Sequence, residues 1–300
     1  MFQDTLSSYT TMSNAGADWS TNLKLVCDLL NGTIVKSGDE FSFNQLIGEP
    51  TAENGYTTVK TYVGKSYREV VGGGISQVAS TLYNCVLMAD LDVLERHTHS
   101  YAPTFVEAGF DAEVFFGQSD FRFRNSTEQP IRIDASLIGN TLTVSIIGTD
   151  KRDYTVEIIY KVDKVKDTTT VYNTMTENNP GGYKDGDILV QPITGYDVST
   201  YMRKYSKDTG TLISETLITT SAYSKLDKVV VKIDMPVTEP PTEAPTQAPT
   251  EALTQEPTQA PTQEPTEEPT QAPTEAPTEE PTEEPTQAPE EEPEEELPVA

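Results

Sequence analysis

The chain has 300 residues, of which 48 are acidic and 21 are basic, giving a formal net charge of -27. This balance argues against nucleic-acid binding, because nucleic-acid-binding domains present a basic face. The sequence contains no run of about 18 apolar residues, so no segment is expected to span a membrane.

The first third of the chain alternates helix and strand patterns. Residues 1–15 are assigned to an N-terminal extension that lacks the basic and apolar layout of a signal peptide. A helix is predicted from Asp18 or Ser20 to Leu30, where apolar side chains recur at helical spacing and the dipeptide Asn31-Gly32 ends the pattern. A short strand is predicted at 41–44, and two more strands at 55–71 on either side of Gly64.

A glycine-rich stretch, "VVGGGISQVASTLYN", precedes a second predicted helix that ends near Asp90. The segment 91–103 is expected to be extended. Alternating patterns then predict strands in 111–116, 121–125 and 131–148, with a tight hairpin turn at Gly139-Asn140. Residues 16–150 are therefore predicted to be an α+β domain in which two main helices pack on an antiparallel sheet.

Residues 151–236 show strand patterns without a helix, and we predict a separate, elongated all-β module. Residues 237–300 have a different composition: from Thr238 onward there are 18 Glu, no basic residue and 15 of the 21 prolines. Such a segment has too little apolar surface to offset its ordering entropy, so a disordered, polyproline-biased tail is predicted.

Ser76 lies at the entrance of the second helix, where unpaired amides and the helix dipole favour an anion or a thiolate. A serine gains little from the dipole and needs a general base within hydrogen-bond reach to act as a nucleophile. The alternative is that Ser76 caps the helix.

His97 and His99 are the two histidines of the chain, and in an extended segment they point to the same side. They could act as a catalytic base and its orienting partner, make structural hydrogen bonds, or bind a metal. A metal site would need a third ligand from Glu95, Asp111 or Asp120. Cys27 and Cys85 fall on the apolar faces of the two predicted helices, where cysteines usually fill the core.

Several stretches resemble the VanW-domain family in order and spacing. They are "NLKLVCDLLNGTIVKSGDEFSFNQLIGEPTAENGY", "GGGISQVASTLYNCVLMADLDVLERHTHS", "GFDAEV" and "FRFRN". The module that follows resembles G5-type domains through "GDILVQPITGYDVSTYMRKYS" and its last strand. Some VanW domains are credited with L,D-transpeptidase activity, in which a cysteine attacks a peptidoglycan stem peptide. The family pattern G-G-G-I-C-Q-V-S-S-T-L-Y places that cysteine at Ser76 of this chain.

The resemblance implies catalytic roles for Ser76, His97 and His99, and no cofactor or metal. The substrate-binding residues that it implies are Gly72, Gly73, Gly74, Gln77, Ser80, Thr81 and Arg96. It also implies a protein on the surface or in the wall of a Gram-positive-type bacterium, with peptidoglycan or another wall polymer as partner. Any activity would be L,D-transpeptidase-like acyl transfer, weakened or lost through Ser76. The alternative is a non-enzymatic adhesion or scaffold protein that binds wall glycans through the G5-like module.

Overall fold

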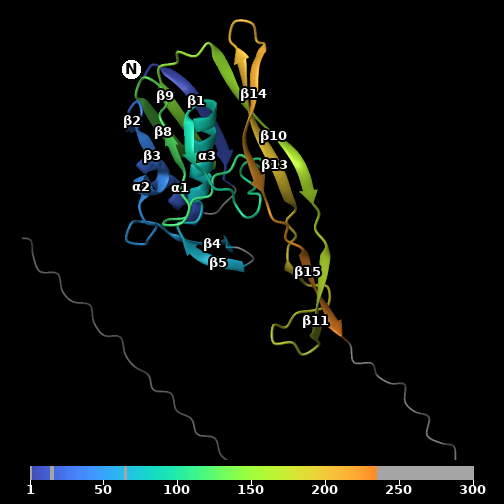
Figure 1. Cartoon of the computed structure of the whole chain (residues 1–300). Coiled ribbons are helices and arrows are strands. Elements are labelled where there is room, and N and C mark those ends of the chain that lie inside the picture. Colours follow the sequence, from blue (N-terminus) through green and yellow to red (C-terminus); the bar gives the residue numbers. More distant parts are fainter. Residues whose placement is uncertain (1, 14–16, 64–65, 235–300) are drawn as a thin grey trace, which may run out of the picture. The chain divides into compact units, whose positions relative to one another are not determined.

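The computed structural model describes residues 2–13, 17–63 and 66–234. The first region is built on a four-stranded sheet in the order β1-β9-β8-β2, and all its neighbouring strands are antiparallel. Figure 1 shows two helices lying against this sheet, α1 (Ala17–Leu30) and α3 (Ile75–Met88). The strands are β1 (Asp4–Met12), β2 (Thr33–Val35), β8 (Ile131–Ile138) and β9 (Thr141–Gly148). The predicted α+β fold class is confirmed.

The core of this region lies between the helices and the sheet. Helix α3 contributes the most, because its positions 77–87 are all buried. Leu23, Val26 and Leu30 of α1 pack into the same cluster, together with Ile131 and Ile133 of the sheet. Burying apolar side chains from both helices and one sheet face supplies the main stabilisation of the fold.

Smaller elements surround the two helices. A three-stranded sheet contains β3 (Glu40–Ser42), β7 (Arg122–Arg124) and β6 (Asp92–Glu95) in that order. The short helix α2 (Phe43–Ile47) follows β3 directly, and Ser42 caps it by accepting a hydrogen bond from the Gln45 amide. The hairpin of β4 (Thr58–Val63) and β5 (Ser66–Val71) leads into the glycine-rich loop before α3.

The second region is all-β, as predicted. It has two three-stranded sheets, in the orders β10-β13-β14 and β11-β15-β12. The first sheet is antiparallel, whereas β11 and β15 pair in parallel in the second. The strands are β10 (Tyr154–Lys166), β11 (Thr170–Thr176), β12 (Ile188–Val190), β13 (Gly195–Ser206), β14 (Leu212–Ala222) and β15 (Lys228–Asp234).

Three expectations differ from the structure, the first being that residues 43–44, expected within a strand, begin helix α2. Strand β1 lies in the segment that the sequence assigns to an N-terminal extension, and it pairs along its length with β9. The segment 111–116, expected to be a strand, makes only isolated bridges, His97 with Glu113 and Phe115 with Ser119. The predicted disordered tail, 237–300, lies outside the described residues. In the part of the chain that the structure describes, no helix has the length and apolarity needed to cross a membrane.

Candidate functional site

The glycine-rich loop before α3 is packed tightly against the rest of the chain. A Cβ at Gly73 would lie 1.9 Å from Cγ2 of Val59, and one at Gly74 would lie 2.8 Å from Cε3 of Trp19. Gly72 and Gly74 also have positive φ angles, 76° and 102°, which side-chain-bearing residues rarely adopt. The space beside these glycines is therefore filled by the chain's own side chains.

Asn22 of α1 fixes the base of the β4–β5 hairpin beside this loop. Its buried side chain donates to the carbonyls of Thr57 (3.1 Å) and Gly73 (3.0 Å) and accepts from the Thr57 amide (2.8 Å). One side chain therefore bonds three backbone groups on both sides of the hairpin base. It holds the loop in the position from which α3 begins.

Ser76 occupies the second position of α3, after the N-cap Gly74 and Ile75. The cap is Gly74 rather than Ser76, so the capping interpretation of Ser76 is wrong. The Ser76 hydroxyl instead bonds the backbone of Val114: it accepts from the amide at 3.2 Å and donates to the carbonyl at 3.3 Å.

Two further side chains continue this pattern along the same face of α3. Ser80 accepts from the amide of Ala112 (2.9 Å), and Asn84 donates to the carbonyl of Phe110 (2.8 Å). The positions 76, 80 and 84 are one helical turn apart, and their partners 114, 112 and 110 alternate along an extended segment. We call these bonds the α3 ladder. They replace the strand pairing that the segment 110–114 would otherwise need.

His97 contacts the segment 110–114 at the edge opposite to the α3 ladder. Glu113, between the ladder residues 112 and 114, donates its amide to the carbonyl of His97 at 2.8 Å. Neighbouring residues of an extended segment direct their backbone groups to opposite edges. Ser76 and the backbone of His97 therefore bond opposite edges of the same segment. The His97 imidazole is 43% exposed and bonds Oε1 of Glu95 at 3.0 Å.

Asp111 forms the most buried ionic cluster of this region. Its side chain is fully buried, and Arg96, itself 7% exposed, donates to Oδ1 at 2.6 Å. Nδ1 of His99 lies 2.6 Å from Oδ2, and the backbone amide of His99 donates to the same atom at 2.7 Å. The hydroxyl of Tyr223, from the all-β region, also donates to Oδ1 and accepts from the amide of Gly109.

The charge of Asp111 follows from this environment. Burial acts to raise the pKa of the carboxyl, but the hydrogen bonds from His99 and the charge of Arg96 outweigh it and lower the pKa to about 2. A carboxylate can only accept, so Nδ1 of His99 carries the proton of this bond. This is the arrangement by which an aspartate orients an imidazole that acts as a base.

Among the predicted substrate-binding residues, several are committed to internal contacts. Gln77 and Thr81 are buried and meet Thr11 of β1, at 3.1 Å and 2.9 Å. Arg96 donates to the carbonyl of Asp111 and to the Ser221 hydroxyl, and its guanidinium lies over the ring of Tyr83. The structure thus brings His99 and Arg96 together on Asp111, and it places Gln77 and Thr81 on a different face of α3 from Ser76.

The two cysteines are free and buried. Burial raises the pKa of each thiol to about 12. The Cys85 thiol donates to the carbonyl of Val144 in β9 at 3.0 Å, on the sheet side of α3, whereas Ser76 bonds the segment 110–114. Neither thiol stands in for the residue at position 76.

Sequence reasoning missed the α3 ladder and the role of Asp111 as the centre of a cluster. The ladder had a signal: Ser76, Ser80 and Asn84 form a polar row, four residues apart, on a helix whose positions 77–87 are otherwise mostly apolar. The partnership of Asp111 with Tyr223 had none, because 112 residues separate the two in the chain.

Residues 19–147 match the family model described as "VanW like protein". The chain is 37% identical over 131 residues to "Uncharacterized protein YoaR" of Bacillus subtilis (strain 168), which is 44% of this chain and 43% of that protein. It is 29% identical over 147 residues to "Vancomycin B-type resistance protein VanW" of Enterococcus faecalis (strain ATCC 700802 / V583), which is 47% of this chain and 52% of that protein.

The chain thus spans about half the length of the curated relatives it matches. A solved structure titled "Crystal structure of HP0197-G5" is similar over 27% of this chain and 99% of that chain, with 13% sequence identity and a TM-score of 0.16.

Proposed function

Because residues 19–147 form a VanW-like domain, we propose that this protein works at the cell wall of a Gram-positive-type bacterium, where it binds peptidoglycan stem peptides without acyl transfer. The observation that carries the proposal is the hydrogen bonding of the Ser76 hydroxyl. This residue stands where the resemblance implies a cysteine, and its hydroxyl both accepts from and donates to the backbone of Val114. A hydroxyl in this state is a structural anchor: within the described part of the chain its bonds go to the Val114 backbone and not to a side-chain base.

The chemistry of Ser76 supports the same proposal. An aliphatic hydroxyl becomes a nucleophile only when a base removes its proton in the attack. The oriented imidazole of His99 is bound to Asp111, while Ser76 bonds the far edge of the segment that contains Glu113. An acyl transfer through Ser76 would have to break the first rung of the α3 ladder before a base could reach the hydroxyl.

The experiment incubates the full chain with disaccharide-tetrapeptides and follows the products by mass spectrometry. We expect no 3-3 crosslinked dimers and no trimmed stems from the natural sequence or from Ser76→Ala, while the tetrapeptide without sugar still binds in a calorimeter. Turnover by the natural chain that disappears in Ser76→Ala would contradict the proposal. Turnover gained in Ser76→Cys would support a peptide-binding face that lacks only its nucleophile.

A second function, wall adhesion through the all-β region, is favoured by one observation. Large apolar side chains are exposed on the edge strand β14, among them Leu212 (52%) and Leu217 (51%). Exposed apolar groups on an unpaired edge are typical of surfaces that bind a partner. The double variant Leu212→Ser, Leu217→Ser should lower retention of the full chain on purified wall fragments if adhesion is the function, and leave it unchanged if the VanW-like domain binds the wall.

A further inference from the structure

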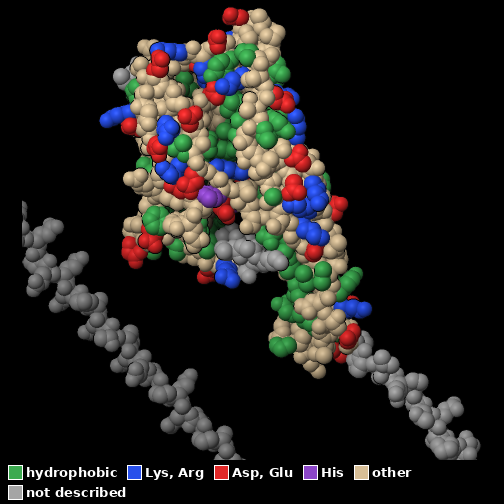
Figure 2. Space-filling view, viewed as in Figure 1, with side chains coloured by type: hydrophobic (Ala, Val, Ile, Leu, Met, Phe, Trp, Pro, Cys, Tyr) green, Lys and Arg blue, Asp and Glu red, His purple; other side chains and the backbone are tan. Residues whose placement is uncertain are grey.

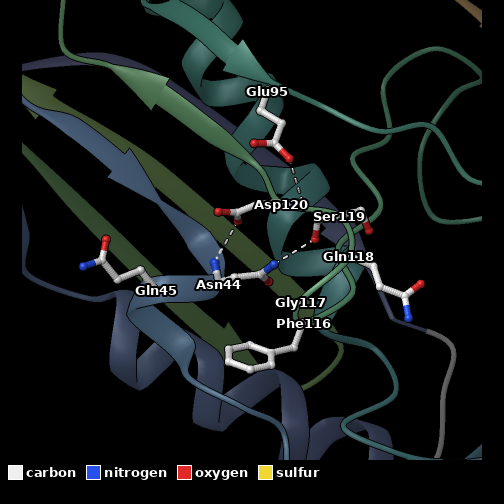
Figure 3. A pocket seen from close by; sticks show the side chains of 8 residues that line it. All are labelled: Asn44, Gln45, Glu95, Phe116, Gly117, Gln118, Ser119 and Asp120. Atoms are coloured by element: carbon white, nitrogen blue, oxygen red, sulfur yellow. Dashed lines mark hydrogen bonds between the residues drawn. The ribbon is translucent and has the colours of Figure 1, made fainter.

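A pocket of about 390 Å³ is lined in part by Glu95, the first residue of the segment 95–99 that carries both histidines and that we call the histidine segment. Figure 3 shows its wall, which comes from three elements: α2, the end of β6 and the loop that begins at Phe116. The lining residues are Asn44, Gln45, Glu95, Phe116, Gly117, Gln118, Ser119 and Asp120. The volume is within the range of small-molecule sites.

The polar lining of the pocket combines two carboxylates with side-chain amides and a hydroxyl. Nδ2 of Asn44 donates to the carbonyl of Ser119 at 2.8 Å, but Oδ1 of the same amide is buried and has no hydrogen-bond partner. Because this oxygen is buried, a ligand in the pocket does not reach it, and Asn44 contributes to the wall only. Asp120 is already occupied, since it accepts from the amides of Asn44 and Phe121 and from Ser42.

Glu95 gives the pocket its charge. Oε1 binds His97 and the Asp120 amide, while the nearest cation to Oε2 is Arg122, at 3.7 Å. No Lys or Arg is among the described lining residues. Figure 2 shows a histidine at the surface beside acidic side chains. An anionic ligand such as a phosphate or a carboxylate would therefore meet repulsion here.

An aromatic wall completes the site. Phe116 is 41% exposed at the pocket, in a loop that turns at Gly117 with a φ of 77°. An exposed ring offers a flat apolar face that packs against C–H groups. A ligand that fits must therefore present an apolar face to Phe116 and hydroxyl or amino donors to Glu95. A pyranose ring has this combination, and neither an anion nor a purely apolar group does.

We propose that this pocket binds a pyranose residue of a neutral or amino-substituted polysaccharide. The lining residues of this pocket do not include Ser76, and the proposal does not depend on stem-peptide binding. It binds the sugar without cleaving it, because the Asp120 carboxylate is fully occupied by backbone and hydroxyl donors and cannot serve as the second carboxylate of a glycosidase.

The test titrates the full chain with three peptide-free trisaccharides: the trimer of N-acetylglucosamine, the trimer of glucosamine and the trimer of galacturonic acid. We expect NMR shift changes at 44–45 and 116–120 with the first two and none with the anionic third. Phe116→Ala should weaken binding about tenfold. Phe115→Ala is the matched control, because this neighbouring ring is also exposed (54%) but does not line the pocket.

Glu95→Gln distinguishes the two sugars, since it should weaken binding of the charged glucosamine trimer and spare the acetylated one. The proposal is overturned if neither neutral nor amino sugar binds at about 10 mM, if the galacturonate trimer binds as well as they do, or if the two phenylalanine variants lose affinity equally. Because the probes carry no peptide, failure here leaves stem-peptide binding intact, and failure of the tetrapeptide probe leaves this proposal intact.

Discussion

Asp111 is the residue on which the histidine segment depends. A fully buried carboxylate beside a nearly buried guanidinium is a costly arrangement unless every partner is present. Here the acceptor capacity is used by Arg96, His99 and Tyr223, and the pKa of about 2 shows that the charged form is the favoured one. Removing the charge leaves Arg96 buried and unpaired.

We therefore expect Asp111→Asn to lower the free energy of unfolding by about 3–5 kcal/mol, the cost of breaking a buried ion pair from one side. Asp28→Asn is the matched control, because Asp28 pairs with Lys24 on the surface, where both side chains are more than 60% exposed. That pair is worth about 0.5 kcal/mol or less. Urea unfolding at neutral pH measures both, and equal losses would contradict the buried-pair account.

The same carboxyl predicts a pH dependence. Its pKa is about 3.8 in the unfolded chain and about 2 in the folded one, so its stabilisation is complete above pH 4 and is lost as the pH falls through 2. The shift corresponds to about 2 kcal/mol. The stability difference between the natural chain and Asp111→Asn, measured in urea at a series of pH values, should shrink in this window. A constant difference from pH 5 to pH 2 would refute the assignment.

At the scale of elements, α3 is held by polar contacts on two faces. One face bonds β1 through Ser7, Thr11 and Thr81, and another bonds the segment 110–114 through the α3 ladder. These two sets of contacts explain why the sequence did not predict strand β1 and wrongly predicted a strand at 111–116. Strand β1 was missed because hydroxyl side chains fill two of its three buried positions, Ser7 and Thr11, where a strand pattern usually shows apolar residues.

The segment 111–116 failed as a strand for a related reason. Its alternation is real, but side chains of α3 take the hydrogen-bond positions on one edge that a neighbouring strand would otherwise occupy. Helices α1 and α3 and the turn at Gly139 were predictable, since local periodicity and turn chemistry determine them. Partnerships between distant segments are not encoded in a local pattern.

The middle rung of the ladder gives a prediction. Ser80 is fully buried and accepts from the amide of Ala112, so Ser80→Ala leaves a buried N–H without a partner and should cost about 1–3 kcal/mol. Ser136→Ala, at an exposed position in β8, should change stability by less than about 0.5 kcal/mol. Thermal unfolding compares the two, and a Ser80→Ala variant as stable as the control would show that the rung is not formed.

At the scale of the whole molecule, the VanW-like domain and the all-β region share hydrogen bonds. Arg152 donates to the carbonyls of Leu6 and Met88, Lys204 and Tyr154 both bond Asp90, and Tyr223 bonds Asp111. The described residues of both regions belong to one compact unit. The sequence predicts a separate module at 151–236, and its boundaries stay a prediction. The shared bonds indicate that the two regions stabilise each other.

Tyr223→Phe tests this coupling by removing a single oxygen atom. The hydroxyl donates to Asp111 and accepts from the Gly109 amide, so its loss leaves one buried donor unpaired and removes one bond to a buried carboxylate. We expect a loss of about 2–3 kcal/mol, and the loss should appear in both regions, since the partners lie in the VanW-like domain. Tyr172→Phe, on a 62% exposed ring of β11, is the control.

Hydrogen exchange followed residue by residue in Tyr223→Phe should show faster opening around Asp111 as well as in β13 and β14. Faster exchange confined to the all-β region would mean that the two regions open independently. The hydrogen bonds between the regions would then not make their unfolding cooperative.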